Sequence, residues 1–130
     1  MYMDASEWDA ALFFDAVPGA YGLYRAFADA VAARWPDATC RVQKTQITFT
    51  NPRVFACVSR LRAKRKAELP DPWITISLGL PCRLASPRVA AQTEPYPGRW
   101  TTHIVFGSPE ELDEELLGWV GQAYDFASKK

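Results

Sequence analysis

The stretch Arg99-Trp100-Thr101-Thr102-His103-Ile104-Val105-Phe106 decides how this 130-residue chain folds. Its side chains alternate in character, and a β-strand sends successive side chains to opposite faces of its sheet. We therefore predict a strand with one core face and one solvated face. The core face would carry Trp100, Thr102, Ile104 and Phe106, and the solvated face Arg99, Thr101, His103 and Val105. Because His103 is the single histidine of the chain, the solvated face is the first place to look for a site.

The flanking segments predict a loop before this strand and a helix after it. Residues 94–98, Glu-Pro-Tyr-Pro-Gly, contain two prolines and a glycine, which disfavour a regular hydrogen-bonded ladder. Residues 108–111, Ser-Pro-Glu-Glu, offer an N-cap hydroxyl, a proline at the first helical position and a glutamate at the third. We expect one continuous helix from Ser108 through Ala127.

The remaining elements follow from a change between helical and twofold periodicity. Helices are expected at residues 6–15 and 20–35, and strands at residues 40–50, 54–61 and 73–80, with an irregular stretch at 81–91. In the third of these strands, Ile74, Ile76, Leu78 and Leu80 would point inward, and Thr75, Ser77 and Gly79 outward.

These elements predict an α+β fold. Its four-stranded, mainly antiparallel sheet would have the N-terminal helices and the C-terminal helix packed on one face, and the other face would be polar. Residues 1–130 would form a single domain, because 130 residues with 48% hydrophobic content suffice for one core.

Composition limits the classes of function. No apolar run is long enough to span a bilayer and no signal-peptide pattern precedes the first predicted helix, so a cytoplasmic protein without membrane association is expected. The three cysteines, Cys40, Cys57 and Cys82, show no Cys-x-x-Cys spacing, so neither a disulfide framework nor a local zinc site is predicted. No sequence feature calls for a cofactor or a metal.

Charge is distributed unevenly although the chain is neutral overall. Residues 40–103 contain eleven Lys or Arg against three acids, a net charge of +8, whereas residues 1–39 and 104–130 each carry −4. Two interpretations stay open. Acidic helices could neutralise a basic sheet, or the sheet could present a basic surface to an anion.

The solvated sheet face is the predicted site. Lys44 and Arg99 would supply fixed positive charge, His103 a pH-sensitive donor, and Ser77 a hydroxyl, with Tyr96 at the rim and Arg83 from the irregular stretch completing the candidate ligand-binding set. Such a set favours a small anionic ligand or an acidic group of a partner. Convergence of these residues depends on strand register, which the sequence does not determine.

Two other classes stay open. One is a protein-interaction or homodimer module. The other is a nucleic-acid-binding accessory domain, favoured by the basic run at residues 60–66 and by aromatic rings such as Trp73 but opposed by the flanking acids. An enzyme ranks below a binding module: His103 could serve as a general base and Ser77, Cys57 or Cys82 as a nucleophile, but no nucleophile-elbow motif surrounds them.

Several motifs resemble an uncharacterised bacterial family of domains of unknown function. They are the segments 44–49 (Lys-Thr-Gln-Ile-Thr-Phe), 86–88 (Ser-Pro-Arg), 99–103 (Arg-Trp-Thr-Thr-His) and 108–124, and the resemblance covers most of the chain. Many relatives carry a His-His pair where this chain has Thr102-His103, which argues against two-histidine chemistry such as metal binding here. The resemblance implies a fold and no reaction.

Overall fold

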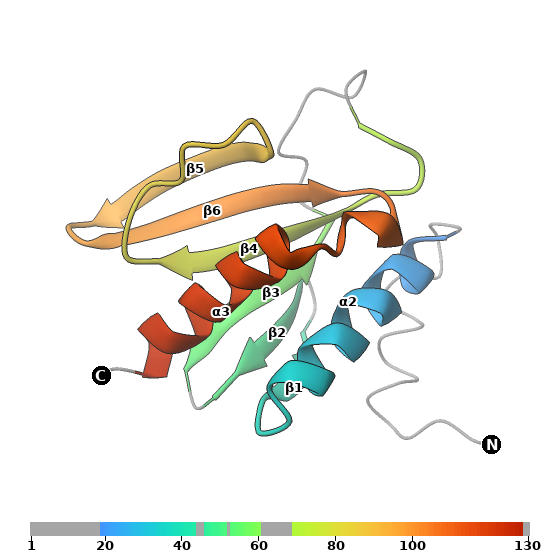
Figure 1. Ribbon diagram of the computed structural model, residues 1–130, viewed down its shortest axis with the longest axis horizontal. Helices are drawn as coiled ribbons and strands as arrows, with labels where there is room; N and C mark the ends of the chain where they lie inside the picture. Colours follow the sequence, from blue (N-terminus) through green and yellow to red (C-terminus); the bar gives the residue numbers. More distant parts are fainter. Residues whose placement is uncertain (1–18, 44–45, 52, 61–68, 129–130) are drawn as a thin grey trace.

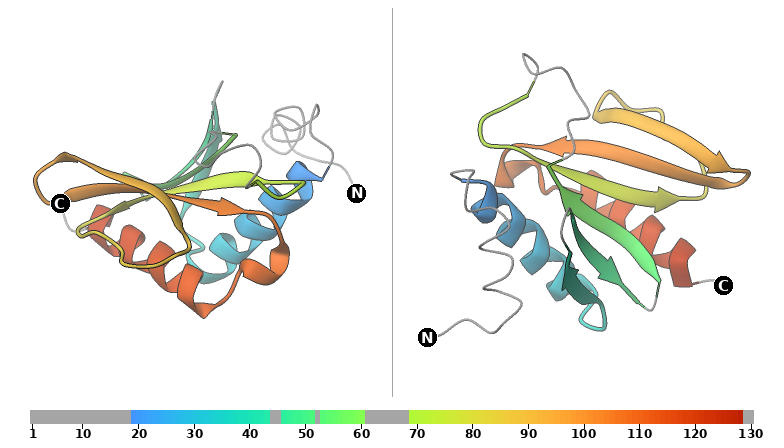
Figure 2. Two further views of the ribbon diagram at one scale, coloured as in Figure 1. Left: turned by 90° about the horizontal axis from the view of Figure 1, so that it is seen from above. Right: turned by 180° about the vertical axis from the view of Figure 1, so that it is seen from behind.

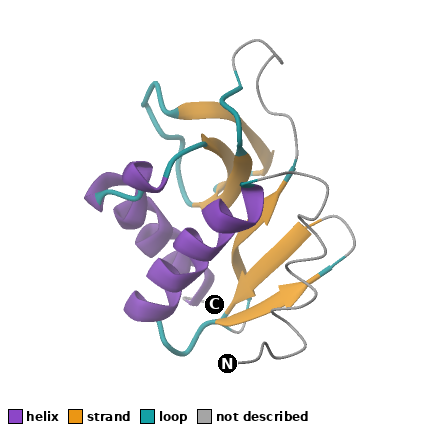
Figure 3. Ribbon diagram, turned by 90° about the vertical axis from the view of Figure 1, so that its right-hand side faces the viewer, coloured by secondary structure: helices purple, strands orange, loops and turns teal. Residues whose placement is uncertain are grey.

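The computed structural model describes residues 19–43, 46–51, 53–60 and 69–128. Within them the chain forms one six-stranded antiparallel sheet with two α-helices on the same face (Figure 1). Seen from the side, the helices form one layer and the strands the other (Figure 3). The α+β class and the predominantly antiparallel sheet are thus confirmed. The helix predicted at residues 6–15 lies outside the described residues.

The sheet contains more strands than the four predicted. Its strands are β1 (Thr39–Val42), β2 (Gln46–Thr50), β3 (Val54–Ser59), β4 (Ile74–Leu80), β5 (Val89–Tyr96) and β6 (Arg99–Phe106). Their order across the sheet is β1-β2-β3-β4-β6-β5, and every neighbouring pair is antiparallel. Strand β6, the stretch quoted first, therefore lies between β4 and β5 (Figure 2).

The two extra strands have separate causes. The single strand predicted at residues 40–50 is the β1–β2 hairpin, closed where the N–H of Gln43 donates to the carbonyl of Gln46 at 2.8 Å. No Gly, Pro or Asn marks this reversal, so the alternation reads as uninterrupted. The second extra strand is β5, which includes residues 94–96 of the predicted loop. A proline at position 95 is tolerated there because β5 is an edge strand and its register shifts between Thr93 and Tyr96.

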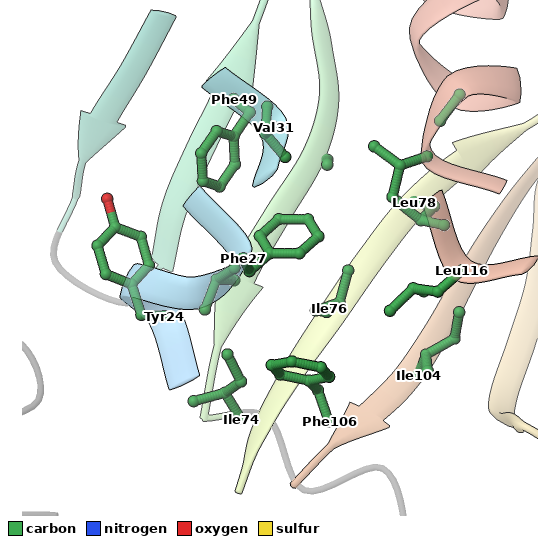
Figure 4. Close-up of a cluster of buried hydrophobic side chains, with 14 of the residues drawn as sticks. Tyr24, Phe27, Val31, Phe49, Ile74, Ile76, Leu78, Ile104, Phe106 and Leu116 are labelled. Atoms are coloured by element: carbon green, nitrogen blue, oxygen red, sulfur yellow. The ribbon is translucent and has the colours of Figure 1, made fainter. Parts of the chain in front are cut away.

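The core lies between the sheet and the helices α2 (Ala20–Arg34) and α3 (Glu114–Ser128). Phe27 and Val31 of α2 and Leu116 of α3 are almost completely buried against Ile76 of β4 and Phe106 of β6 (Figure 4). Helix α3 packs on β3 and β4. The inward set predicted for β4 is confirmed, as is that of β6 except for Trp100, which is half-buried.

The continuous helix predicted from Ser108 is wrong at its first turn. The capping box of Ser108 and Glu111 forms, but it caps a short 3₁₀ helix, η2 (Pro109–Glu111), and α3 begins only at Glu114. The Glu111 carbonyl, which a continuous helix would use, accepts a hydrogen bond from the Arg88 guanidinium at 2.8 Å instead. Asp113 then caps α3 by accepting the N–H of Leu116 at 3.0 Å.

Candidate functional site

The outer face of the sheet, opposite α2 and α3, carries three polar side chains in one cross-strand line. The register pairs Cys57 of β3 with Ser77 of β4, and Ser77 with His103 of β6. Paired residues of antiparallel strands share a face and lie side by side. We call Cys57, Ser77 and His103 the polar row. Their outward orientation follows from their neighbours in sequence, since Ile76 and Leu78 are buried on the helix side.

Within the polar row, Ser77 and His103 make a direct hydrogen bond. The Ser77 Oγ and the His103 Nδ1 are 2.7 Å apart. Burial lowers the pKa of the half-buried imidazole below its ordinary value, which favours neutral His103 at pH 7. In the tautomer that keeps its proton on Nε2, Nδ1 accepts the Ser77 hydroxyl proton. The row therefore contains a hydroxyl held against a basic nitrogen.

Cys57 extends the row on the other side of Ser77. Its thiol is a free cysteine of intermediate exposure. Burial raises the pKa of the Cys57 thiol, and a hydrogen bond with Ser77 acts in the opposite direction without cancelling the effect of burial. Cys57 is thus a neutral thiol at pH 7 and supports Ser77 as a weak hydrogen-bonding neighbour.

Arg99 lies beside the polar row and covers a glycine of the central strand. A Cβ on Gly79 would be only 2.8 Å from the Nη2 of Arg99, so the guanidinium lies directly against the backbone of β4. Its Nη1 donates to the Thr101 hydroxyl at 3.1 Å. A glycine within a strand often marks such a close approach, and here it leaves room for a planar cation on the outer face.

A small hollow of about 60 Å³ joins these groups. Polar side chains that line it include Cys57, Ser77, Thr101 and Arg99, and Val54, which is 48% exposed, contributes an apolar surface. The hollow is large enough for one end of a small molecule. The Ser77 hydroxyl and the Arg99 guanidinium therefore line the same hollow.

The structure places the residues predicted from the sequence as follows. Ser77 and Arg99 line the hollow, whereas His103 lies opposite Ser77 on the outer face and does not line it. Tyr96 is paired with Arg99 in the β5–β6 register and is 58% exposed. Arg83 is exposed in the segment between β4 and β5 and forms no hydrogen bond or ion pair with another described residue. Lys44 lies outside the described residues.

The expectation that the centre of this face is solvated is wrong. Thr75 and Ser77 point to the outer face but are only 0% and 8% exposed. These short side chains are in a central strand, where Val105 and His103 of β6 lie opposite them and help to shield them. Sequence reasoning also missed Cys57 as the partner of Ser77 and Gly79 as the floor under Arg99. The glycine inside an otherwise regular strand was the available signal.

The described residues also bear on metal binding, membrane insertion and nucleic-acid binding. Among the described residues there is no group of His, Cys, Asp and Glu side chains that could hold a metal ion, and none of the described helices combines the length and apolar character needed to cross a membrane. The guanidinium of Arg60, the first residue of the basic run, stacks on Trp73 at 3.9 Å and donates to its carbonyl, so this ring face is occupied. Residues 61–66 lie outside the described residues.

The residues of the candidate site lie in a segment that matches a protein family. The family model described as Domain of unknown function (DUF5655) matches residues 15–127. This agrees with the resemblance found in the motifs. No curated protein and no solved structure matches the chain. The match covers β1 to β6 and almost all of α3, so every residue of the polar row and Arg99 is inside it.

Proposed function

We propose that this chain, which belongs to the family described as Domain of unknown function (DUF5655), binds a small anion on the outer face of its sheet. The ligand is a carboxylate or a phosphate, free or as an acidic group of a partner. Arg99 is the main contact, with Thr101 and Ser77 as hydroxyl neighbours. His103 positions Ser77, and Tyr96 borders the approach to Arg99.

The observation that carries this proposal is the incomplete pairing of Arg99. A guanidinium presents a planar fork of N–H donors, yet the one hydrogen bond that its side chain makes to a described residue uses the uncharged Thr101 hydroxyl. Among the described residues no carboxylate pairs with it. A half-buried guanidinium gains from a bidentate anion because such a partner matches both its charge and its geometry.

The neighbouring groups suit the same ligand. The Thr101 hydroxyl accepts from Arg99 and so keeps its own proton available as a donor. Burial lowers the pKa of His103, so at pH 7 the positive charge that attracts an anion comes from Arg99. The side chains around the hollow therefore offer donors to an anion on one side and the apolar surface of Val54 on the other.

The test is direct titration of the full chain with acetate, succinate and inorganic phosphate, followed by NMR. Wild type should show saturable shifts at the amides of Gly79, Arg99 and Thr101. Arg99→Met keeps the length of the side chain and removes the charge. It should weaken binding by about 10- to 100-fold, since a hydrogen bond to a charged group contributes about 1.5–3 kcal/mol.

Arg83→Met is the matched control, because it removes an exposed arginine that is not part of the hollow. It should bind each anion as the wild type does. If none of the three anions gives saturable shifts, or if Arg83→Met weakens binding as much as Arg99→Met, the proposed site is wrong.

A further inference from the structure

Anion binding by Arg99 leaves the best-defined contact of the outer face unexplained. The Ser77 hydroxyl is held at 2.7 Å from an imidazole nitrogen and opens onto the same hollow as the guanidinium. We infer that Ser77 is a nucleophile activated by His103, and that the chain hydrolyses a short ester whose acid part carries a second, free carboxylate held by Arg99. This inference rests on the proposed anion site.

The spacing along β4 defines the substrate class. Ser77 and Gly79 are two positions apart on the same face, which in a strand corresponds to about 6.6 Å, and Arg99 covers Gly79. A molecule with its carboxylate on the guanidinium thus places a carbonyl carbon at Ser77 when the two groups are separated by a short chain. Half-esters of dicarboxylic acids with roughly four to six carbons have this span.

The polar row supplies the proton transfers. His103 Nδ1 takes the proton of Ser77 as Oγ forms a bond to the carbonyl carbon, and the carbonyl π electrons move to its oxygen. When the tetrahedral species collapses, the bond to the alcohol oxygen breaks and Nδ1 returns the proton to the departing alcohol. Water then attacks the acyl carbon with the same help from His103, and Ser77 leaves as the hydroxyl. Ester and water become acid and alcohol, with no redox change.

Two features keep this geometry in place. Ser77 is only 8% exposed and lies in a central strand, so β3 and β6 fix its orientation on both sides. The hydrogen bond to His103 aligns the hydroxyl along the row, and Cys57 lies opposite Ser77 on its other side. Positioning of this kind is what a nucleophile and its base require.

The experiment measures methanol release by NMR from monomethyl succinate, monomethyl glutarate and the uncharged dimethyl succinate. Wild type should release methanol faster than buffer and should prefer the half-esters. Ser77→Ala should reduce the rate to that of buffer. His103→Gln should lower kcat by about 100-fold or more. Arg99→Met should raise KM for the half-esters about 10- to 100-fold and remove the preference over the diester.

A second readout tests the nucleophile independently of the ester. A fluorophosphonate should form a P–O bond with Ser77, releasing fluoride, and mass spectrometry of the digested protein should find the adduct on Ser77. His103→Gln should slow labelling, whereas Arg34→Met, which changes the helix side of the sheet, should label and turn over as the wild type does. Circular dichroism melts of each variant establish that it is folded.

The outcomes separate this inference from the proposed function. If succinate binds at Arg99 but no ester is hydrolysed faster than in buffer and Ser77 is not labelled, Ser77 is not a nucleophile and the anion site stands. A rate that persists in folded Ser77→Ala also overturns the inference. If succinate does not bind and no half-ester is preferred, the anion site and the inference both fail.

Discussion

Arg88 and Arg99 use the same functional group in opposite ways. The Arg88 guanidinium donates to both carboxylate oxygens of Asp113 at 2.9 and 3.1 Å, to Glu115 at 3.0 Å and to the Glu111 carbonyl at 2.8 Å. Arg99 has one hydroxyl acceptor among the described residues and lies against a bare stretch of backbone. Arg88 links the start of β5 to the segment that leads into α3, whereas Arg99 keeps N–H donors that no described residue uses.

Pairing between Arg88 and Asp113 shifts the pKa values of both groups. Burial alone would lower the pKa of Arg88, but its hydrogen bonds to Asp113 and Glu115 raise it above the ordinary value. The Leu116 N–H, and after it Arg88, holds the pKa of Asp113 below its usual range. Part of the excess of basic residues in the middle segment is therefore neutralised by acids of the C-terminal segment, as one interpretation of the charge pattern predicted.

Exchanging each arginine for methionine should separate the two roles. Arg88→Met should lower the free energy of unfolding by about 2 kcal/mol, because several charge-assisted contacts of a quarter-exposed side chain are lost. Arg99→Met should change it by less than about 0.5 kcal/mol. Urea unfolding of both variants measures the difference. Equal destabilisation would mean that Arg99 is also structural, and a loss of anion affinity in Arg88→Met would mean that the two regions are coupled.

The floor under Arg99 offers a subtler test. In Gly79→Ala the new Cβ would meet Nη2 at 2.8 Å, and because this atom ends a flexible side chain, the guanidinium should move at little cost in stability. We expect succinate affinity to fall about fivefold. Gly118→Ala is the control. Gly118 lies on an exposed part of α3, where a Cβ would meet nothing within 4 Å outside its own helix, so the change should raise stability by about 0.5–1 kcal/mol and leave affinity unchanged.

The outer sheet face around His103 and the Arg88 region should affect stability over different pH ranges. Burial lowers the pKa of His103 below 6.5, so the unfolded chain binds the proton more readily. Stability should therefore rise as pH increases from the lowered pKa to about 6.5 and then level off, and His103→Gln should remove this slope. Since His103 is the only histidine, its ring proton signals report the titration directly by NMR; a midpoint above 6.5 would contradict the burial argument.

The Arg88 region should lose stability only in more acidic solution. The pKa of Asp113 is lowered from 3.8, so its contribution is present above about that pH and disappears as pH falls through the lowered value. Asp113→Asn should remove this acidic slope and leave the slope that belongs to His103. Urea unfolding at closely spaced pH values resolves the two. A single merged transition that both variants alter equally would refute the assignment.

The smallest expected change in stability comes from an exposed ion pair between α2 and α3. Arg34 at the end of α2 contacts Glu114 at the start of α3 at 2.5 Å, and the two side chains are 40% and 85% exposed. Arg34→Gln should lower the free energy of unfolding by about 0.5 kcal/mol in dilute salt, and added salt should abolish the difference. A loss as large as that in Arg88→Met would mean that exposure is a poor guide to the role of an arginine here.

The fold was predictable where the apolar residues of a strand or helix recur at its own period and so lie on the face that packs in the core. The alternation in β4 and β6 matches their buried sides, and the apolar spacing of residues 20–34 matches α2. Predictions failed where tertiary contacts override local signals. No residue type between 40 and 50 indicates the β1–β2 turn. The Glu111 carbonyl, which would have continued the predicted helix, accepts a hydrogen bond from Arg88, a residue distant in sequence.

The candidate site was predictable only as a list of residue types. His103, Ser77 and Arg99 were named from the sequence because a solvated strand face with these groups suits an anion. Which of them meet depends on register. A shift of one position would place His103 opposite Ile76 or Leu78, whose side chains point to the helix side of the sheet, and the hydrogen bond to Ser77 could not form. The pairing of Cys57, Ser77 and His103 is therefore information that only the folded sheet contains.

The insertion of β6 between β4 and β5 has a consequence for the newborn chain. Ser77 emerges from the ribosome well before His103, and the edge of β4 has no partner until the β5–β6 hairpin has been synthesised and docks as a unit. A nascent chain that ends before Arg99 thus has an unprotected strand edge and lacks Arg99 and Thr101 of the proposed anion site. Docking of the β5–β6 hairpin closes that edge and, in the same step, would complete the proposed anion site.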